Sequence, residues 1–304
     1  IIVWLLGGFI LSAVVKKELA FALMFIKVAI VVVHFTFFAD GGWFYGGDDQ
    51  SYFGRGIELL QTGRSPLDIW SHPTALYLAQ TRDSLWYFYL YNYFAVYLIG
   101  PYYYSPVLFN LLCSVLTVVF LARLVQPFSK NRQYVTFFVI FASIHWMTLA
   151  WTSFLDLKGP LVSCLMALAL LGLARVPQNW FRNLLFVFAS FAIFSKVRFY
   201  FPGIILAGYV AAMSFEYKSW LLRRKGIVLV SLLPIVGIGL FILKRQVGLF
   251  LDLANFERFP YEALHFILQP IPWNITSATS YLLLPAILHW VFFVPGLIGA
   301  ALLW

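Results

Sequence analysis

The chain has 304 residues, of which 62% are hydrophobic and only 11% are charged. Average soluble domains carry about 45–50% apolar and about 25% charged residues, so this composition excludes a water-soluble globular protein and predicts an integral membrane protein. The net charge of +9 comes from basic residues scattered through short loops. Because they form no basic stripe or helix of the kind that binds a phosphate backbone, we expect no nucleic-acid partner.

Apolar stretches occur along most of the sequence. A helix that crosses the hydrocarbon core needs about 20 apolar residues, and the segments that approach this length are about 1–15, 19–39, 107–125, 134–152, 160–176, 183–196, 199–215, 227–243 and 281–303. They predict an all-α, polytopic bundle of about eight or nine spans, forming a single transmembrane domain without a soluble domain. Both ends of the chain are apolar, and we expect them to be cut within membrane-embedded elements.

The aromatic segment 84–98 decides the topology. It is long enough to span, but its aromatic side chains suit the membrane interface, where Trp and Tyr concentrate. If it lies along the interface, the loops after the spans alternate, and one side receives the basic residues Lys16, Lys17, Arg123, Lys130, Arg132, Arg175, Arg182, Lys218, Arg223, Arg224 and Lys225. The positive-inside rule favours this arrangement. It places the long loops 40–106 and 244–280 on the external, non-cytoplasmic face.

The first external loop carries two adjacent carboxylates, Asp48 and Asp49, after two Gly-Gly pairs. Such a pair can act as general base or metal ligand, or Asp49 can simply cap a helix that begins at Gln50. The stretch 52–62 after it reads as a short amphipathic helix closed by Gly63. With the segment 84–98 it would form interfacial helices over a cavity at the membrane surface.

Two further loops on the same face carry charge. Asp156 and Lys158 join two spans, as either a functional pair or an ordinary interfacial ion pair. Lys196 and Arg198 lie in a predicted turn or helix break between 183–196 and 199–215, where they would hold a lipid phosphate or snorkel toward headgroups. Both interpretations of each pair stay open.

The last external loop contains Glu257 and Arg258, followed by Trp273 in a proline-rich segment. Trp273 can stack on a sugar or anchor the chain at the interface. Lys27, inside a span, is predicted to face a polar cavity or a partner subunit. The sequence contains no phosphate-binding loop, dinucleotide fingerprint or zinc motif.

The order of these features resembles the C-type (GT-C) superfamily of integral membrane glycosyltransferases, which use polyprenyl-phosphate sugars. The matching pieces are Gly47-Asp48-Asp49-Gln50-Ser51-Tyr52, the helices near 52–62 and 84–98, Leu155-Asp156-Leu157-Lys158 and Lys196-Val197-Arg198. Many members carry a soluble C-terminal domain, and none is visible in this sequence; an Asp-Asp pair is also not diagnostic of one branch.

The resemblance implies a transferase of the cell membrane (the inner membrane in a bacterium) with its active site on the non-cytoplasmic face. Asp48 or Asp49 would be the general base, with Asp156 as a further catalytic acid. Lys158, Lys196, Arg198, Glu257, Arg258 and Trp273 would bind substrate. No nucleotide or redox cofactor is required, although a divalent cation held by Asp48, Asp49 and Asp156 stays open. The expected partners are membrane lipids, the polyprenyl-phosphate sugar donor and further protein subunits.

A non-catalytic membrane subunit of a larger complex, or a transporter of lipid-linked sugars, is the alternative. Transporters commonly show internal repeats and interrupted helices near the midplane. No repeat is visible here, and the charges gather at a membrane boundary, which favours an enzyme.

Overall fold

The computed structural model describes residues 1–37, 48–63, 65–68, 86–128, 131–176 and 178–197, together with the single positions 202, 205, 206, 209, 273, 283, 286, 287, 290 and 291. The chain divides into two compact units, residues 1–202 and residues 203–304. Nearly all described residues belong to the first unit.

Throughout the described ranges, the regular secondary structure is helical. The helices are α1 (Ile2–Leu11), α2 (Lys17–Phe37), α3 (Asp48–Gln61), α5 (Trp86–Ile99), α6 (Tyr104–Val125), α7 (Arg132–Ile144), α8 (Trp146–Ser153), α9 (Gly159–Ala174) and α10 (Trp180–Val197), with a short 3₁₀ turn, η2 (Gln126–Phe128), after α6. The predicted all-α class is therefore confirmed for this part of the chain.

Two of these helices are long and apolar enough to cross a membrane. They are α2, with 21 residues, and α6, with 22 residues, and they match the predicted spans 19–39 and 107–125. A helix rises about 1.5 Å per residue, so each covers the roughly 30 Å of a hydrocarbon core. Shorter apolar helices surround them: Ile2–Leu11, Arg132–Ile144, Gly159–Ala174 and Trp180–Phe194.

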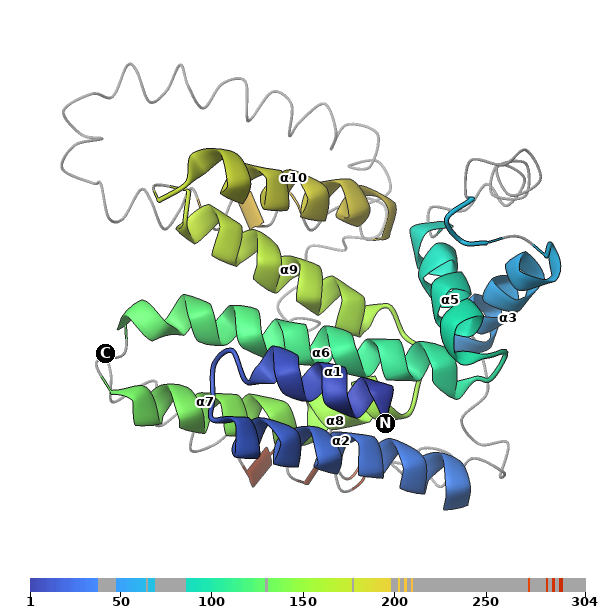
Figure 1. Ribbon diagram of the computed structural model, residues 1–304, viewed down its shortest axis with the longest axis horizontal. Coiled ribbons are helices and arrows are strands. Elements are labelled where there is room, and N and C mark those ends of the chain that lie inside the picture. Colours follow the sequence, from blue (N-terminus) through green and yellow to red (C-terminus); the bar gives the residue numbers. More distant parts are fainter. Residues whose placement is uncertain are drawn as a thin grey trace. The chain divides into compact units, whose positions relative to one another are not determined.

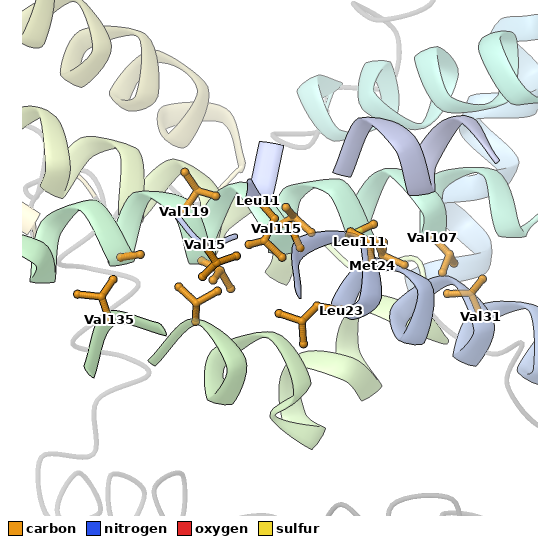
Figure 2. Close-up of a cluster of buried hydrophobic side chains, with 14 residues drawn as sticks. Leu11, Val15, Leu23, Met24, Val31, Val107, Leu111, Val115, Val119 and Val135 are labelled. Carbon is orange, nitrogen blue, oxygen red and sulfur yellow. The ribbon is translucent and has the colours of Figure 1, made fainter. Parts of the chain in front are cut away.

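The hydrophobic core lies where α1, α2, α6 and α7 pack together. Figure 2 shows its aliphatic side chains pointing toward one another from these helices, among them Leu11, Met24, Leu111 and Val115. The helix α1 folds back closely on α2, since a Cβ atom added to Gly7 would lie 2.3 Å from the side chain of Met24. A side chain at this crossing would have to displace the flexible end of Met24.

The helices α3 and α5 stand apart from this core. Figure 1 shows them packed together at the end of α6 where that helix begins. The opposite end of the bundle holds basic residues: Arg175, after α9, donates a hydrogen bond of 3.4 Å to the carbonyl of Arg123, near the end of α6. The connections after α6 and after α9 therefore lie at the same end.

The structure corrects two sequence predictions. The predicted span 134–152 is broken at His145, whose ψ of 124° ends α7 before α8 begins; the segment contains neither Gly nor Pro, the usual causes of a sharp break, and so gives no sign of it. The turn predicted around 195–198 is also wrong for residues 195–197, because α10 continues to Val197.

Candidate functional site

Three segments that are far apart in sequence meet at the end of the bundle where α6 begins. They are the first turn of α3, the residues just before α6, and the connection between α8 and α9. Each contributes one polar residue to a common hydrogen-bonded group: Asp49, Tyr103 and Asp156. We refer to these three residues as the acid site.

Asp49 lies in the first turn of α3, which begins at Asp48. Its side chain is buried, and its Oδ2 accepts a hydrogen bond of 2.6 Å from the hydroxyl of Tyr103. A carboxylate is favoured at a helix N-terminus, because the aligned peptide dipoles leave partial positive charge there. The helix-cap interpretation of Asp49 is wrong, since the residue lies inside the helix and its carboxylate accepts from another segment.

Asp156 lies between α8 and α9 and is fully buried. Its backbone N–H donates a hydrogen bond of 3.3 Å to the same Tyr103 hydroxyl. Neither of its carboxyl oxygens accepts a hydrogen bond from the part of the chain that the structure describes. Burial raises the pKa of this carboxyl well above its ordinary value, and the negative charge of Asp49 raises it further. The nearby amide of Asn92 acts in the opposite direction, although it forms no hydrogen bond with the carboxyl.

Tyr103 thus joins the two acidic residues through one hydroxyl, which donates to Asp49 and accepts from the Asp156 backbone. Burial and the hydrogen bond to Asp49 both raise the pKa of this phenol. The group therefore stays protonated at neutral pH and keeps its donor role. Its ring lies against Phe35 of α2 and Phe53 of α3, with ring centroids 6.1 and 5.6 Å away.

Lys158 reaches the same region from the start of α9. Its Nζ donates a hydrogen bond of 3.0 Å to the hydroxyl of Tyr52 on α3 and lies 5.3 Å from the centroid of that ring. The contact combines a charge-assisted hydrogen bond with a cation–π interaction. A cation is therefore held against the same turn of α3 that carries Asp49.

A second set of polar side chains supports the connection that carries Asp156. Tyr91 of α5 donates a hydrogen bond of 2.9 Å to the side-chain oxygen of Asn110 on α6, and the Asn110 amide donates one of 3.3 Å to the carbonyl of Leu155. Asn92, also on α5, is fully buried, and its Oδ1 accepts no hydrogen bond from the described residues. Buried polar atoms usually have partners, so the unpartnered oxygens of Asn92 and Asp156 mark this region as unusual.

The structure does not place the side chains of the remaining predicted site residues relative to the acid site. Asp48 is the first residue of α3, but its side chain lies outside the described part, as does that of Lys196 in the last turn of α10. Arg198, Glu257 and Arg258 lie wholly outside it. Trp273 belongs to the second unit, where its side chain is 74% exposed and its ring lies 5.7 Å from that of Trp290.

A metal centre finds no direct support. Among the residues whose side chains the structure describes, no group of three His, Cys, Asp or Glu residues is suited to hold a metal ion. The cation left open for Asp48, Asp49 and Asp156 stays a prediction, because the Asp48 side chain lies outside that part.

No protein-family model, curated protein or solved structure matches this chain. The function must therefore be inferred from the chemistry of the acid site.

The residue that sequence reasoning missed is Tyr103. It belongs to the run Pro101-Tyr102-Tyr103-Tyr104, directly before the predicted span 107–125. A tyrosine at a membrane boundary is ordinarily an interfacial anchor, and that interpretation hides its hydrogen bonds. Its position in the sequence could have indicated the role, because Tyr103 precedes a predicted span on the same face as Asp49 and Asp156.

Proposed function

We propose that this chain is a multi-pass membrane glycosyltransferase that moves a sugar from a lipid-phosphate-linked donor to a hydroxyl acceptor, with Asp49 as the general base. The observation that carries the proposal is the meeting of Asp49 and Asp156 on one tyrosine hydroxyl, next to a cation on Lys158. A base can deprotonate the acceptor hydroxyl, and a cation can stabilise the charge on the leaving phosphate, so these groups at one end of an apolar bundle support sugar transfer from a phosphate.

Membrane embedding by eight or nine spans belongs to the same proposal. The helices α2 and α6 have the length and apolarity of spans, and the acid site lies beside the beginning of α6. The Arg175–Arg123 contact marks the other end of the same helix. Basic residues at one end of the bundle are what the positive-inside rule predicts for the cytoplasmic end, which leaves the acid site on the external face.

In the reaction, Asp49 removes the proton from the acceptor hydroxyl as its oxygen attacks the anomeric carbon of the donor. The bond between that carbon and the phosphate oxygen breaks, and the lipid phosphate leaves with the electron pair. Asp156 keeps its proton to higher pH than an ordinary carboxyl, because burial raises its pKa, and it is the second acid of the site. Lys158 is placed to stabilise the charge that develops on the phosphate, and contacts from Lys196 and Arg198 stay predictions.

The decisive measurement is transfer of a radiolabelled sugar from a lipid-phosphate donor by the purified protein. Asp49→Asn should lower kcat by about 10²–10⁴-fold, the range for loss of a general base. Asp48→Asn tests the neighbouring acid, and Glu18→Gln, an exposed acid at the start of α2, is the matched control. Undiminished transfer by Asp48→Asn, Asp49→Asn and the double variant would remove the catalytic assignment. An inactive but folded wild-type protein would favour the non-catalytic subunit.

Topology can be tested separately. With Cys113 and Cys164 replaced by Ala, single cysteines at the exposed positions 51 and 159 should react with an impermeant maleimide from one side of the membrane. Cysteines at the exposed positions 133 and 178 should react only from the other side. Labelling of positions 51 and 159 from opposite sides would contradict a shared external site.

A further inference from the structure

The two acidic residues of the acid site are carried by different segments of the chain. Asp49 is carried by α3, whereas Asp156 lies in the connection between α8 and α9. No hydrogen bond joins the two carboxyl groups directly, because neither carboxyl oxygen of Asp156 has a hydrogen-bond partner among the described residues. The contact between Lys158 and Tyr52 joins the same two segments, but a group that touches both acidic residues can set their relative position directly.

The Tyr103 hydroxyl is that group. A phenol has one donor and can accept as well, and here both capacities are used: the donor goes to Asp49 Oδ2 at 2.6 Å and the oxygen accepts the Asp156 N–H at 3.3 Å. The first distance is short for an O–H···O bond, as expected where the acceptor is a carboxylate. Rotation of the phenol would break both contacts together.

The position of Tyr103 is itself fixed by the turn that precedes α6. Gly100 has φ +130°, a conformation that side chains rarely adopt, and its carbonyl accepts hydrogen bonds from the Tyr102 N–H and the Ser105 hydroxyl. The ring is held between Phe35 and Phe53. A half-buried ring with an aromatic neighbour on each of two sides, together with an anchored backbone, leaves the hydroxyl little freedom.

We propose that Tyr103 is a positioning residue, whose hydroxyl sets the orientation of the Asp49 carboxylate and its placement relative to Asp156. Its role in catalysis rests on the glycosyl transfer proposed above. The two hydrogen bonds of its hydroxyl, which we call the bridge, can be tested without substrate. Tyr103 need not touch the sugar. It acts by holding the base where an acceptor hydroxyl can be deprotonated, and small displacements of such groups are costly in rate.

The first test uses Tyr103→Phe, which removes the hydroxyl and keeps the ring, and compares it with Tyr102→Phe, the exposed neighbour. Hydrogen–deuterium exchange followed by mass spectrometry should show about five- to tenfold faster exchange of the amides at 154–158 in Tyr103→Phe, as expected when one hydrogen bond is lost. Exchange within α6 and throughout Tyr102→Phe should match wild type. Equal exchange at 154–158 in the two variants would overturn the bridge.

The second test is kinetic. Tyr103→Phe should lower kcat about 10- to 100-fold while the KM for the donor stays within about threefold of wild type, because a positioning residue affects the reacting geometry more than substrate binding. An unchanged kcat would overturn the positioning role. If wild type transfers no sugar, the proposed function fails, but the exchange measurement still decides whether Tyr103 joins the two acids.

A second pair of variants keeps the inference testable if Tyr103→Phe does not fold. Asp49→Asn keeps an oxygen that can accept from the Tyr103 hydroxyl, whereas Asp49→Ala removes the acceptor. Faster exchange at 154–158 in Asp49→Ala than in Asp49→Asn supports the bridge. Identical exchange in both would contradict it.

Discussion

The Nζ atom of Lys27 on α2 donates a hydrogen bond of 3.2 Å to the hydroxyl of Ser114 on α6, and the Lys27 side chain is fully buried. The Ser114 hydroxyl in turn donates to the carbonyl of Leu111, so its oxygen can accept from Lys27. The partner expected from the sequence, a polar cavity or another subunit, is thus a serine of the same chain. Within the described residues, no salt bridge involves this lysine.

Replacement of Lys27 by Met should leave stability unchanged or raise it by about 1–4 kcal/mol, because a buried charge without a counter-charge is costly and Met fills a similar volume. Ser114→Ala should instead destabilise by about 1–3 kcal/mol, since it leaves the ammonium without its acceptor. Thermal unfolding in detergent measures both, with the exposed Lys17→Met as control. Marked destabilisation by Lys27→Met would show that the charge has a role that its packing does not explain.

Two glycines of α3 offer a matched comparison. A Cβ atom at Gly56 would lie 2.9 Å from Cβ of Asn92 on α5, whereas a Cβ atom at Gly54 would meet nothing within 4 Å. Gly56→Ala should therefore destabilise by about 1–3 kcal/mol through overpacking and should also reduce activity, because Asn92 lies beside Asp156. Gly54→Ala should stabilise by about 0.5–1 kcal/mol through helix propensity. Equal effects of the two changes on unfolding would contradict the close α3–α5 contact.

The pH dependence of stability should carry the signature of Asp156. The unfolded chain releases this proton near the ordinary pKa of 3.8, whereas the folded chain holds it to higher pH. Between these two pKa values the folded state binds more protons, so stability falls as pH rises, by at most about 1.4 kcal/mol per pH unit. Asp156→Asn should remove this part of the slope and raise the unfolding temperature at neutral pH. The Glu18→Gln control should keep the wild-type slope.

Lys158 should affect the phosphate-bearing substrate more than the acceptor. Lys158→Gln is expected to raise the KM for the lipid-phosphate donor and to lower kcat about tenfold or more, because a cation near the leaving phosphate is lost. Tyr52→Phe keeps the ring beneath Lys158 but removes the hydroxyl that orients it, so a smaller loss is expected. Steady-state kinetics with the donor varied would reveal the difference. A change confined to the KM for the acceptor would contradict the assignment.

Hydrophobic patterning was enough to find most of the described helices. The predicted spans 19–39 and 107–125 correspond to α2 and α6. The amphipathic stretch 52–62 overlaps α3, which begins four residues earlier and ends at Gln61, and Gly63 follows in the left-handed region at φ +70°. What patterning could not reveal is the break at His145, because the residues on both sides are equally apolar. Tertiary packing rather than local propensity must decide such a break.

The acid site was only partly predictable. Asp49 and Asp156 stand out in an apolar sequence because carboxylates near a membrane need a reason to be there. Tyr103 does not, since the chain contains 17 tyrosines and the two hydrogen bonds of this one depend on the packing of α3 and of the α8–α9 connection around it. The sequence is enough to predict the charged residues of the site, but the tyrosine that joins them can be identified only from the three-dimensional structure.

The arrangement around Tyr103 also constrains how the protein can assemble. Asp49 and Tyr103 are separated by 54 residues in sequence, and Tyr103 and Asp156 by 53, so the site closes two long loops in succession. Closing each loop costs chain entropy before any contact compensates for it. During synthesis, the α3 segment must wait for the start of α6, and both must wait until the segment after α8 has emerged. A fragment that ends before residue 156 contains the residues of the apolar core but lacks part of the acid site.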